Sequence, residues 1–382
     1  MVAKKIILSS NTAWSVYNFR RGLISAFIEN GHEVIVLAPT DKYQKKIEGL
    51  GCSFINIKLS QRGLSPFSEL VSLAYYFIIL KRVRGDFYLG FTIKPNIYGG
   101  IIARLLGINC VLNVTGLGKG FNKGKRLSEK FLFALYKFAF SFSTVFFQNK
   151  HDQFFFNKYG LLSRSKVCLL PGSGVDLNFF KPLTVPNSTS NIRSFVKFSF
   201  IGRLLASKGV FTFVEAARTI RETFPDVKFE IIGQICLTDG DCITKSQLKD
   251  WNEEGVVDYV GYSDDIRIQL MNTDCVVLPS IYREGTPRSL LEAGAMGVPI
   301  ITTNMPGCED TVEHGFNGFI CEPSSAFDLA KKIEQFLLLT ASEKKIMGNN
   351  SRVYIENNFD ETLVIEAYFD ALKLEKKNIC EF

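Results

Sequence analysis

Histidine is scarce in this chain: its 382 residues include only three, His32, His151 and His314. A zinc site built on histidine, or a nucleophile activated by histidine, requires this residue beside other reactive side chains. The composition therefore argues against both kinds of catalytic centre.

Cysteine is present but forms no recognisable framework. The nine cysteines lie singly along the chain, and an odd number cannot all pair within one molecule. The closest two, Cys236 and Cys242, lack the two further ligands that a zinc ion would require. We interpret the cysteines as a reduced set of small core residues, which is typical of a cytosolic protein.

The chain also lacks a long hydrophobic run. Its longest, residues 70–80, is far shorter than the roughly 20 residues that a spanning helix requires. Near the amino terminus only Ile6, Ile7 and Leu8 stand between two lysines and polar residues, which is too short for the apolar region of a signal peptide. We therefore expect a cytoplasmic protein.

The remaining composition indicates two globular domains. The length suits two domains of about 180 residues each. Hydrophobic residues at 46% and charged residues at 22% are typical of a globular chain. Residues 1–180 carry 24 Lys+Arg against 9 Asp+Glu, although the net charge of the whole chain is only +7. This basic half is expected to meet a polyanionic surface, unless charge varies between domains by chance.

The hydrophobic pattern predicts strands that alternate with helices. An apolar strand at residues 5–9 is followed by residues 19–29, in which Phe19, Leu23 and Phe27 share one helical face. Further strands are expected at residues 33–38, 54–57, 87–91, 109–113, 144–147, 167–170, 196–201, 228–233, 257–260, 275–279, 299–303 and 318–321. This alternation favours an α/β fold with parallel, doubly wound sheets.

The polar, turn-rich residues 181–194 are the best candidate for an interdomain linker. They separate an expected N-terminal domain, 1–181, from an expected C-terminal domain, 195–360. Residues 361–382 include a final helical stretch, about 362–374, that we expect to cross back to the first domain. The predicted architecture is two Rossmann-like domains with parallel sheets facing across a ligand-binding cleft.

The segment from Pro279 to Pro299, PSIYREGTPRSLLEAGAMGVP, carries the clearest functional pattern. We expect a strand, a loop with Glu284, and a helix that Thr286 caps and Pro287 begins. The amides and the dipole at such a helix start suit a diphosphate. A carboxylate on the second turn, at position 292, can accept hydrogen bonds from both hydroxyls of a ribose.

Glu284 and Glu292 are separated by seven residues, and in this setting the segment resembles the GT-4 family of glycosyltransferases, which have the GT-B fold. The resemblance implies that Glu284 is catalytic and that Gly285, Thr286 and Pro287 contact the donor sugar, while Glu292 binds the ribose. The alternative is a chance pair of glutamates, one of them a solvated helix charge.

A second element, FIGRLLASKG at residues 200–209, resembles the family's G-R-x-x-x-x-K-G motif. After Gly202, the cations of Arg203 and Lys208 can neutralise a diphosphate and stabilise the departing nucleotide. The alternative is two surface cations. Three residues that end further strands resemble the family's base-contacting loops: Gly233, Gly261 and Tyr262.

The amino-terminal half resembles the family less closely. The loop after the first strand, residues 11–18, has no glycine, and we expect Arg20 to begin the following helix. The sequence NVTGLG, residues 113–118, resembles members that act on lipid-diphosphate-linked oligosaccharides. The acceptor-side candidates are Asn18, Arg20, Lys94, Thr115 and Gly116.

Aromatic stretches beside cations suggest a membrane surface as a partner. Residues 70–80 precede Lys81, Arg82 and Arg84, and residues 131–142 read FLFALYKFAFSF. A cationic run lies between them: Lys119, Lys123, Lys125, Arg126 and Lys130. Such surfaces suit anionic lipid and a polyprenyl diphosphate carrier. Alternatively both stretches are buried core helices, which periodicity does not distinguish.

Asp239-Gly240-Asp241 matches the D-x-D motif that metal-dependent transferases of the other fold use. It lies in a polar loop, and we interpret it as a surface turn. Arg203 and Lys208 can supply the positive charge that a metal ion would provide, so we expect no metal and no cofactor. The family resemblance also implies front-face attack with retention of configuration.

These patterns predict a retaining glycosyltransferase that moves a sugar from a nucleotide-sugar to a polyprenyl-diphosphate-linked saccharide at the inner face of the membrane. The resemblance favours a UDP-N-acetylhexosamine donor and a role in bacterial surface polysaccharide assembly. The alternatives are a non-catalytic nucleotide-sugar or carbohydrate-binding protein, and an epimerase or hydrolase on the same fold. Residues 116–120 lack the spacing of a dinucleotide fingerprint, and no nucleic-acid-binding motif is present.

Overall fold

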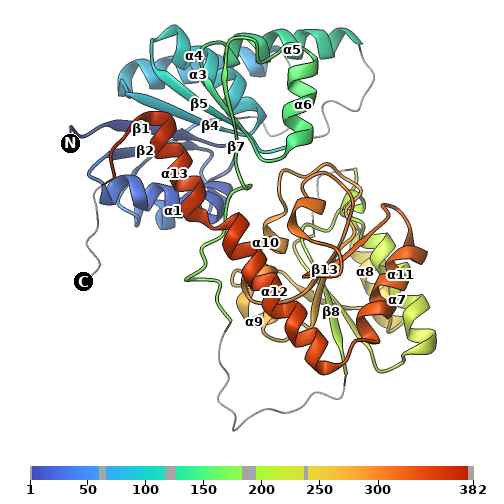
Figure 1. Ribbon diagram of the computed structural model, residues 1–382. Helices are drawn as coiled ribbons and strands as arrows, with labels where there is room; N and C mark the ends of the chain where they lie inside the picture. Colours follow the sequence, from blue (N-terminus) through green and yellow to red (C-terminus); the bar gives the residue numbers. More distant parts are fainter. Residues whose placement is uncertain (1, 60–65, 117–125, 183–194, 236–239, 377–382) are drawn as a thin grey trace, which may run out of the picture. The chain divides into compact units, whose positions relative to one another are not determined.

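The computed structural model of the chain describes residues 2–59, 66–116, 126–182, 195–235 and 240–376, without the side chains of residues 66–68 and 126–129. The chain forms two compact units (Figure 1). The first unit comprises Met1–Gly174 and Glu361–Phe382, and the second comprises Val175–Asp360. Most of the expected linker, residues 183–194, lies outside the described residues.

The first unit contains a seven-stranded parallel sheet in the order β3-β2-β1-β4-β5-β6-β7. The strands are β1 (Lys5–Ser9), β2 (Glu33–Ala38), β3 (Ser53–Asn56), β4 (Phe87–Phe91), β5 (Asn109–Val114), β6 (Thr144–Phe147) and β7 (Lys166–Leu169). The inner strands are buried along most of their length, because helices cover both faces of a parallel sheet.

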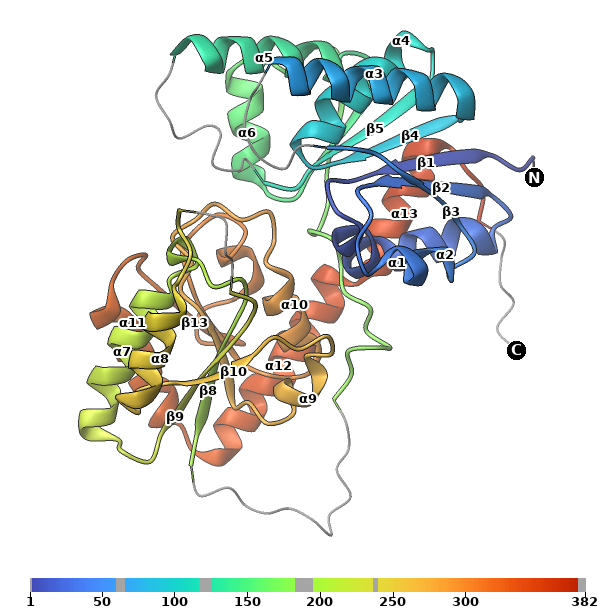
Figure 2. The same ribbon diagram turned by 180° about the vertical axis from the view of Figure 1, so that it is seen from behind.

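Two helical layers cover this sheet (Figures 1 and 2). One face carries α3 (Pro66–Val83), the π-helix η1 (Pro95–Gly99), α4 (Gly100–Leu105), α5 (Arg126–Phe140) and α6 (Lys150–Lys158). The other face carries α1 (Ala13–Glu29), α2 (Gln44–Glu48) and α13 (Glu361–Leu372). A separate cluster of buried apolar side chains fills the space under each layer.

The first helix begins earlier than the sequence suggested. It starts at Ala13, and the Thr12 hydroxyl accepts a hydrogen bond from the backbone N–H three residues on, at 3.1 Å. The expectation that residues 11–18 form a loop and that Arg20 begins the helix is therefore wrong. The physical reason is a good N-cap residue followed by a buried face that includes Val16 and Arg20.

The last helix, α13, is part of the first unit. The Tyr368 hydroxyl accepts a hydrogen bond from Asn113 Nδ2 at 2.9 Å, across 255 positions of sequence. Beside it, the ring of Phe369 stacks on Phe27 with 5.1 Å between centroids. Burial raises the pKa of Tyr368 to about 12, so its hydroxyl is neutral at physiological pH. Helix α13 thus completes the core under one face of the sheet.

The Tyr368→Phe substitution is expected to lower the free energy of unfolding of the first unit by about 1–2 kcal/mol, because it leaves the buried Asn113 amide without its acceptor. Urea unfolding followed by Trp14 fluorescence, in a Trp251→Phe background, would report on this unit alone. Tyr159→Phe removes the same atom from a ring that is 50% exposed and should change little. Equal effects of the two substitutions would contradict the assignment.

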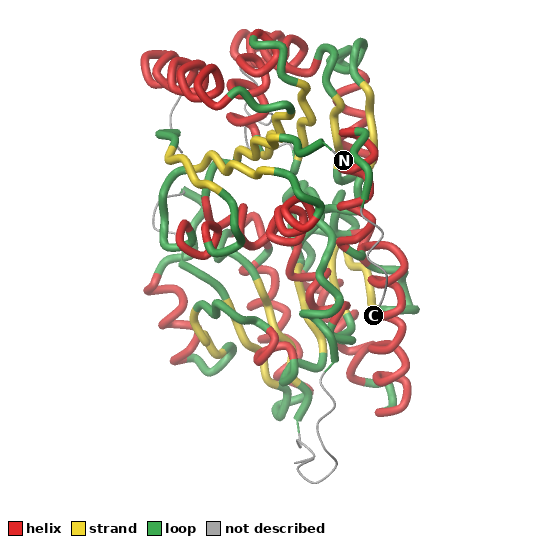
Figure 3. Tube along the Cα trace, turned by 90° about the vertical axis from the view of Figure 1, so that its left-hand side faces the viewer, coloured by secondary structure: helices red, strands yellow, loops and turns green. Residues whose placement is uncertain are grey.

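The second unit contains a six-stranded parallel sheet in the order β10-β9-β8-β11-β12-β13. Figure 3 draws the strands in yellow and the helices in red. Its strands are β8 (Lys197–Ile201), β9 (Lys228–Ile232), β10 (Asp258–Gly261), β11 (Cys275–Leu278), β12 (Ile300–Thr303) and β13 (Gly318–Cys321). Its helices are η4 (Ala206–Lys208), α7 (Val210–Thr223), α8 (Lys245–Glu253), α9 (Arg267–Leu270), α10 (Arg288–Ala295), η5 (Glu309–Thr311), α11 (Ala326–Leu337) and α12 (Ala341–Phe359).

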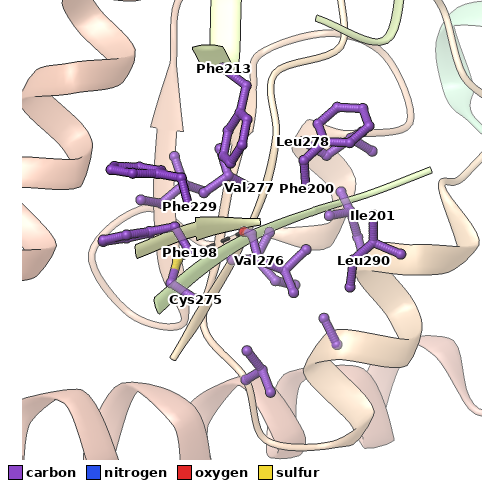
Figure 4. Packing of buried hydrophobic residues seen from close by; sticks show 14 of the residues in the cluster. Phe198, Phe200, Ile201, Phe213, Phe229, Cys275, Val276, Val277, Leu278 and Leu290 are labelled. Atoms are coloured by element: carbon purple, nitrogen blue, oxygen red, sulfur yellow. Dashed lines mark hydrogen bonds between the residues drawn. The ribbon is translucent and has the colours of Figure 1, made fainter. Parts of the chain in front are cut away.

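Aromatic side chains fill one side of this second sheet (Figure 4). Phe198 stacks on Phe229 at 5.4 Å between centroids, and Phe213 of α7 lies against Phe229 at 5.7 Å and against Phe200 at 5.8 Å. Leu290 of α10 is also fully buried. The aromatic contacts hold β8, β9 and α7 together, and the loops that follow β8 and β9 leave from this packed layer.

Candidate active site

The strand order of the second unit reverses at β8, whose neighbours are β9 on one side and β11 on the other. Loops that leave the carboxyl ends of such strands diverge, and α/β proteins bind ligands at this switch point. The loop after β8 carries Gly202, Arg203 and Lys208, and the loop after β11 carries Glu284. The fold thus brings the two sequence motifs to one edge of one sheet.

An ion pair joins these two loops. Lys208 Nζ contacts Glu284 Oε1, and each side chain is only 12% exposed. The Ser280 hydroxyl also donates a hydrogen bond to Glu284 Oε1, at 3.2 Å. Arg203, in the same loop as Lys208, follows Gly202 at the end of β8 and is exposed to solvent. The site therefore combines one shielded ion pair with one accessible cation.

Glu292 lies on the second turn of α10, as the sequence predicted, and pairs with Arg288. Arg288 Nε lies 3.0 Å from Glu292 Oε1, and the two side chains are 13% and 18% exposed. The guanidinium of Arg288 also lies 5.8 Å from the centroid of the Phe180 ring. Sequence reasoning missed Arg288, although its four-residue spacing from Glu292 on a helix is a recognised signal for such a pair.

Thr286 does not cap α10, contrary to expectation. The N-cap residue is Pro287, with φ −64° and ψ 115°, and no side-chain cap hydrogen bond is made there. The extended conformation at Pro287 moves the first helical residue to Arg288, which leaves Thr286 one position too early to cap. Helix α10 still begins beside the loop that contains Glu284 and Gly285.

Two glycines of this edge are required by close backbone contacts. Gly209 has φ +80°, and a Cβ atom there would lie 1.9 Å from the Pro279 carbonyl oxygen. A Cβ atom at Gly233 would lie 1.8 Å from the Gly202 carbonyl oxygen. The loops after β8, β9 and β11 therefore touch through their main chains. The structure shows this backbone packing at Gly202 and Gly233. The predicted contact of Gly233 with a base and the predicted place of Gly202 in the donor site stay predictions.

Gly261 and Tyr262 end β10 at the outer side of the same edge. Gly261 has φ +93° with no atom near the position of an added Cβ, and the Tyr262 side chain is 44% exposed. Their predicted contact with a base stays a prediction as well.

A buried thiol that sequence reasoning missed lies behind the ion pair. Cys308 is fully buried, and burial together with the negative charge of Glu284 raises its pKa to about 12, although the charge of Lys208 opposes this rise. The thiol is therefore protonated at physiological pH and is no nucleophile. No spacing in the sequence links Cys308 to Glu284, since the loop that contains it folds back from a later strand.

Gly209→Ala is expected to destabilise the second unit by at least about 2 kcal/mol more than Gly315→Ala, because overpacking adds to the cost of a left-handed backbone. Both glycines have φ near +80°, but no atom lies near an added Cβ at Gly315. Unfolding in urea, followed by Trp251 fluorescence in a Trp14→Phe background, would measure the difference. Similar losses in the two variants would show that the contact with Pro279 is not limiting.

In the first unit, two acceptor-side candidates lie within α1. Asn18 is half-buried, and its Nδ2 donates a hydrogen bond to the Trp14 carbonyl at 2.8 Å. Arg20 is only 4% exposed, and its guanidinium lies 4.3 Å from the centroid of the Phe91 ring. The structure thus buries Arg20 under one face of the sheet, against the last residue of β4.

The other acceptor-side candidates follow β4 and β5, which are neighbours in the sheet. Lys94 pairs with Glu69 at 2.8 Å, and the two side chains are 20% and 14% exposed. Thr92, just before, has φ +73°, an uncommon conformation for a β-branched residue. Thr115 and Gly116 follow β5 directly, so the fold brings them to the same edge as Lys94.

The described residues contain no group of three or more His, Cys, Asp or Glu side chains that could hold a metal ion. Of the D-x-D motif, Asp239 lies outside the described residues. Asp241 is described, and its Oδ2 accepts a hydrogen bond from the Ser207 N–H at 3.2 Å. This aspartate therefore contacts the loop that carries Lys208.

Known families match both halves of the chain. Residues 191–354 match the family of glycosyl transferases group 1, and residues 5–150 match glycosyl transferase 4-like proteins. A Campylobacter jejuni relative, N,N'-diacetylbacillosaminyl-diphospho-undecaprenol alpha-1,3-N-acetylgalactosaminyltransferase, is 29% identical over 97% of this chain and 98% of its own length. An Escherichia coli relative, UDP-Gal:alpha-D-GlcNAc-diphosphoundecaprenol alpha-1,3-galactosyltransferase, is 31% identical over 78% of each chain.

Solved structures show the same fold. Anabaena HepE in complex with UDP-glucose matches with a TM-score of 0.79 at 19% identity, over 97% of this chain and 99% of that one. A glycosyltransferase from Rickettsia africae matches with a TM-score of 0.77 at 18% identity, over 98% of both chains. These matches confirm the predicted GT-B fold of two Rossmann-like units with parallel sheets. Both family matches and the similarity to the Escherichia coli relative lead to the same assignment as the motifs after β8 and β11. The chain belongs to the group 1, GT-4-like glycosyltransferases.

Proposed function

We propose that this enzyme transfers an N-acetylhexosamine from a UDP-sugar to a saccharide carried on a polyprenyl diphosphate, in the assembly of a bacterial surface polysaccharide. Support for the acceptor comes from the two relatives, whose names specify sugars linked to undecaprenol through a diphosphate. The nearly full-length Campylobacter relative transfers N-acetylgalactosamine. The observation that carries the proposal is the Lys208–Glu284 pair at the switch point, in which Lys208 lies on the same loop as Arg203.

In the proposed complex, Arg203 and Lys208 bind the diphosphate of the donor, together with the amino end of α10. When the diphosphate binds Lys208, the ion pair between Lys208 and Glu284 breaks. The Glu284 carboxylate can then accept a hydrogen bond from a hydroxyl of the donor sugar. Gly285, Thr286 and Pro287 line the sugar with their main chain. Glu292, which Arg288 holds at 3.0 Å, accepts hydrogen bonds from the ribose.

The same cations serve the reaction step. Negative charge develops on the leaving phosphate oxygen as the glycosidic bond breaks, and fixed positive groups stabilise this charge in the transition state. We propose front-face attack without a metal ion, in which the leaving phosphate accepts the proton of the acceptor hydroxyl. Support for retention comes from the alpha linkages in the names of both relatives, since UDP-galactose is itself alpha-linked.

Binding and turnover of UDP-sugars in EDTA would test the donor site. Arg203→Ala and Glu292→Ala are each expected to weaken UDP-sugar binding about 10- to 100-fold, because each removes hydrogen bonds that involve a charged group. Arg221→Ala and Glu222→Ala make the same changes at the far end of α7 and should have less than about a twofold effect. A requirement for Mn²⁺ or Mg²⁺, or equal effects of all four substitutions, would contradict the proposal.

We also propose that the first unit docks on an anionic membrane surface near its lipid-linked acceptor. No helix among the described residues has the length and apolar character needed to cross a bilayer. Helix α3 buries Tyr76 but exposes 63% of Ile78, and α5 buries Tyr136 but exposes 67% of Phe131. Each helix is therefore a core helix on one side, as the alternative interpretation held, and carries apolar side chains in solvent on the other.

Cations accompany these exposed apolar residues. The Arg104 guanidinium lies 4.5 Å from the centroid of the Phe138 ring and 5.3 Å from that of Phe142. The Phe142 side chain is 72% exposed, and Arg164 lies 5.8 Å from the same ring. Arginine beside aromatic surface suits an interface with anionic headgroups. Of the predicted cationic run, Lys119, Lys123 and Lys125 lie outside the described residues.

Phe142→Ser combined with Phe131→Ser is expected to weaken binding to phosphatidylglycerol vesicles about tenfold or more, since about 25 cal/mol per Å² of apolar burial is lost. Vesicle sedimentation at low and high salt would measure this effect. Phe327→Ser is a matched control in the second unit, because Phe327 is 69% exposed and Lys331 lies 4.2 Å from its ring centroid. An equal loss in the control, or equal binding to neutral vesicles, would refute the assignment.

A further inference from the structure

Asp241, the described aspartate of the D-x-D motif, is not used in the proposed reaction and lies against the loop that carries Arg203 and Lys208. Residues 241–243 run antiparallel to residues 204–207 and form a short ladder with them. Its contacts are Ala206 N–H to the Asp241 carbonyl at 2.8 Å, Ile243 N–H to the Leu204 carbonyl at 3.0 Å, and a bridge between Leu205 and Cys242. Residues 241–243 therefore pair with the loop after β8 at the switch point, and for Asp241 the interpretation of a surface turn is incomplete.

The side chain of Asp241 adds a contact to this ladder. Its Oδ2 accepts a hydrogen bond from the Ser207 N–H at 3.2 Å, at the first turn of η4. The local N-cap residue of η4 is Leu205, which makes no side-chain cap hydrogen bond. The first amides of a helical turn need acceptors from outside the turn. Asp241 provides two of them, one from its carbonyl and one from its carboxylate, and so acts as an N-cap from a distant part of the sequence.

Ser207 connects Asp241 to the ion pair through its main chain. Its carbonyl accepts a hydrogen bond from the Ile281 N–H at 3.0 Å and lies 3.3 Å from the Ser280 hydroxyl oxygen. The Ser280 hydroxyl also lies within hydrogen-bonding distance of Glu284, and Glu284 contacts Lys208, the residue after Ser207. Asp241 therefore stands at one end of a connected set of polar contacts that ends on the Lys208–Glu284 pair.

We propose that Asp241 is a positioning residue of the donor site: it holds η4 in place so that Lys208 and Arg203 meet the diphosphate of the nucleotide. This inference rests on the proposed function and extends it to a residue outside the GT-4 motifs. Asp241 itself touches no substrate. It acts through the Ala206 and Ser207 amides, and its effect is on the placement of the cation that follows them.

The Asp241→Asn substitution distinguishes a role in hydrogen bonding from a role in metal binding. An asparagine at position 241 keeps an oxygen that can accept from the Ser207 N–H, but it carries no charge. The positioning role needs only the oxygen that accepts from the Ser207 N–H. The negative charge of Asp241 is not needed for it, because a negative charge near Lys208 lowers the positive potential that a diphosphate meets. A metal site of the D-x-D kind needs anionic oxygen ligands. Asp241→Asn should therefore preserve donor binding if Asp241 positions η4 and should abolish activity if it binds a metal.

The full-length enzyme is compared with its Asp241→Ala and Asp241→Asn variants in EDTA, by calorimetry with UDP and by steady-state kinetics with the UDP-sugar. We expect Asp241→Ala to raise Kd and KM about five- to tenfold, where fivefold corresponds to about 1 kcal/mol. Asp241→Asn should stay within about twofold of the parent enzyme, and kcat should change less than KM in both. Asp250→Ala removes an exposed carboxylate from the neighbouring helix α8 and serves as the control.

Hydrogen exchange provides a readout that needs no ligand. In Asp241→Ala the Ser207 amide loses its acceptor, so the peptide covering residues 203–209 should exchange faster, whereas Asp241→Asn should keep the protection of the parent enzyme. If the parent enzyme binds no UDP-sugar, the proposed function fails, and the exchange rates still decide whether Asp241 holds η4.

Two results would overturn the inference. The first is an unchanged KM and unchanged exchange in Asp241→Ala. The second is inactivity of both Asp241 variants together with a need for Mn²⁺ in the parent enzyme, which would make the motif a metal site.

Discussion

The second unit, residues 175–360, is the proposed donor half of this molecule. Its site depends on close backbone contact between loops that leave different strands of one parallel sheet. Gly209 approaches the Pro279 carbonyl and Gly233 approaches the Gly202 carbonyl so closely that no side chain fits at either glycine. The first contact sets the distance between the loops after β8 and β11, and the second sets that between the loops after β8 and β9. The Lys208–Glu284 pair can form across that gap only because the main chains already lie at the required separation. Uncharged backbone packing thus determines where the charged side chains of Lys208 and Glu284 lie.

Both glutamates of the GT-4 motif are paired within the second unit, Glu284 with Lys208 and Glu292 with Arg288. A carboxylate of low exposure needs a compensating cation, because removing one member of such a pair leaves an uncompensated charge away from water. The two glutamates differ in where their cation lies. Glu292 has a partner on its own helix, which a ribose can approach without breaking the pair. Glu284 shares its partner with the proposed diphosphate, so the state of Lys208 links nucleotide binding to the availability of Glu284.

The sheets could be predicted closely from the sequence, because strands covered on both faces are continuous apolar runs. The strands at residues 5–9, 33–38, 87–91 and 144–147 have the expected bounds. The start of α1 was missed because the cap at Thr12 precedes a stretch with little apolar periodicity. The motif residues were found by local spacing, whereas the partners Lys208 and Glu284 are 76 positions apart. The role of Asp241 had no local signal at all, since its contacts run to residues 204–207 through the folded backbone.

The membership of α13 in the first unit has a consequence for the order in which the chain acquires its structure. Phe27, Phe91 and Phe146 pack against Phe369 or Tyr368, so their layer of the first core stays open until residues 361–372 have been made. The second unit is continuous from residue 175 to residue 360 and has all of its strands before that point. During synthesis, which proceeds from the amino terminus, the donor half is therefore the first to be complete. Loss of the last helix would damage the half of the protein that is made first.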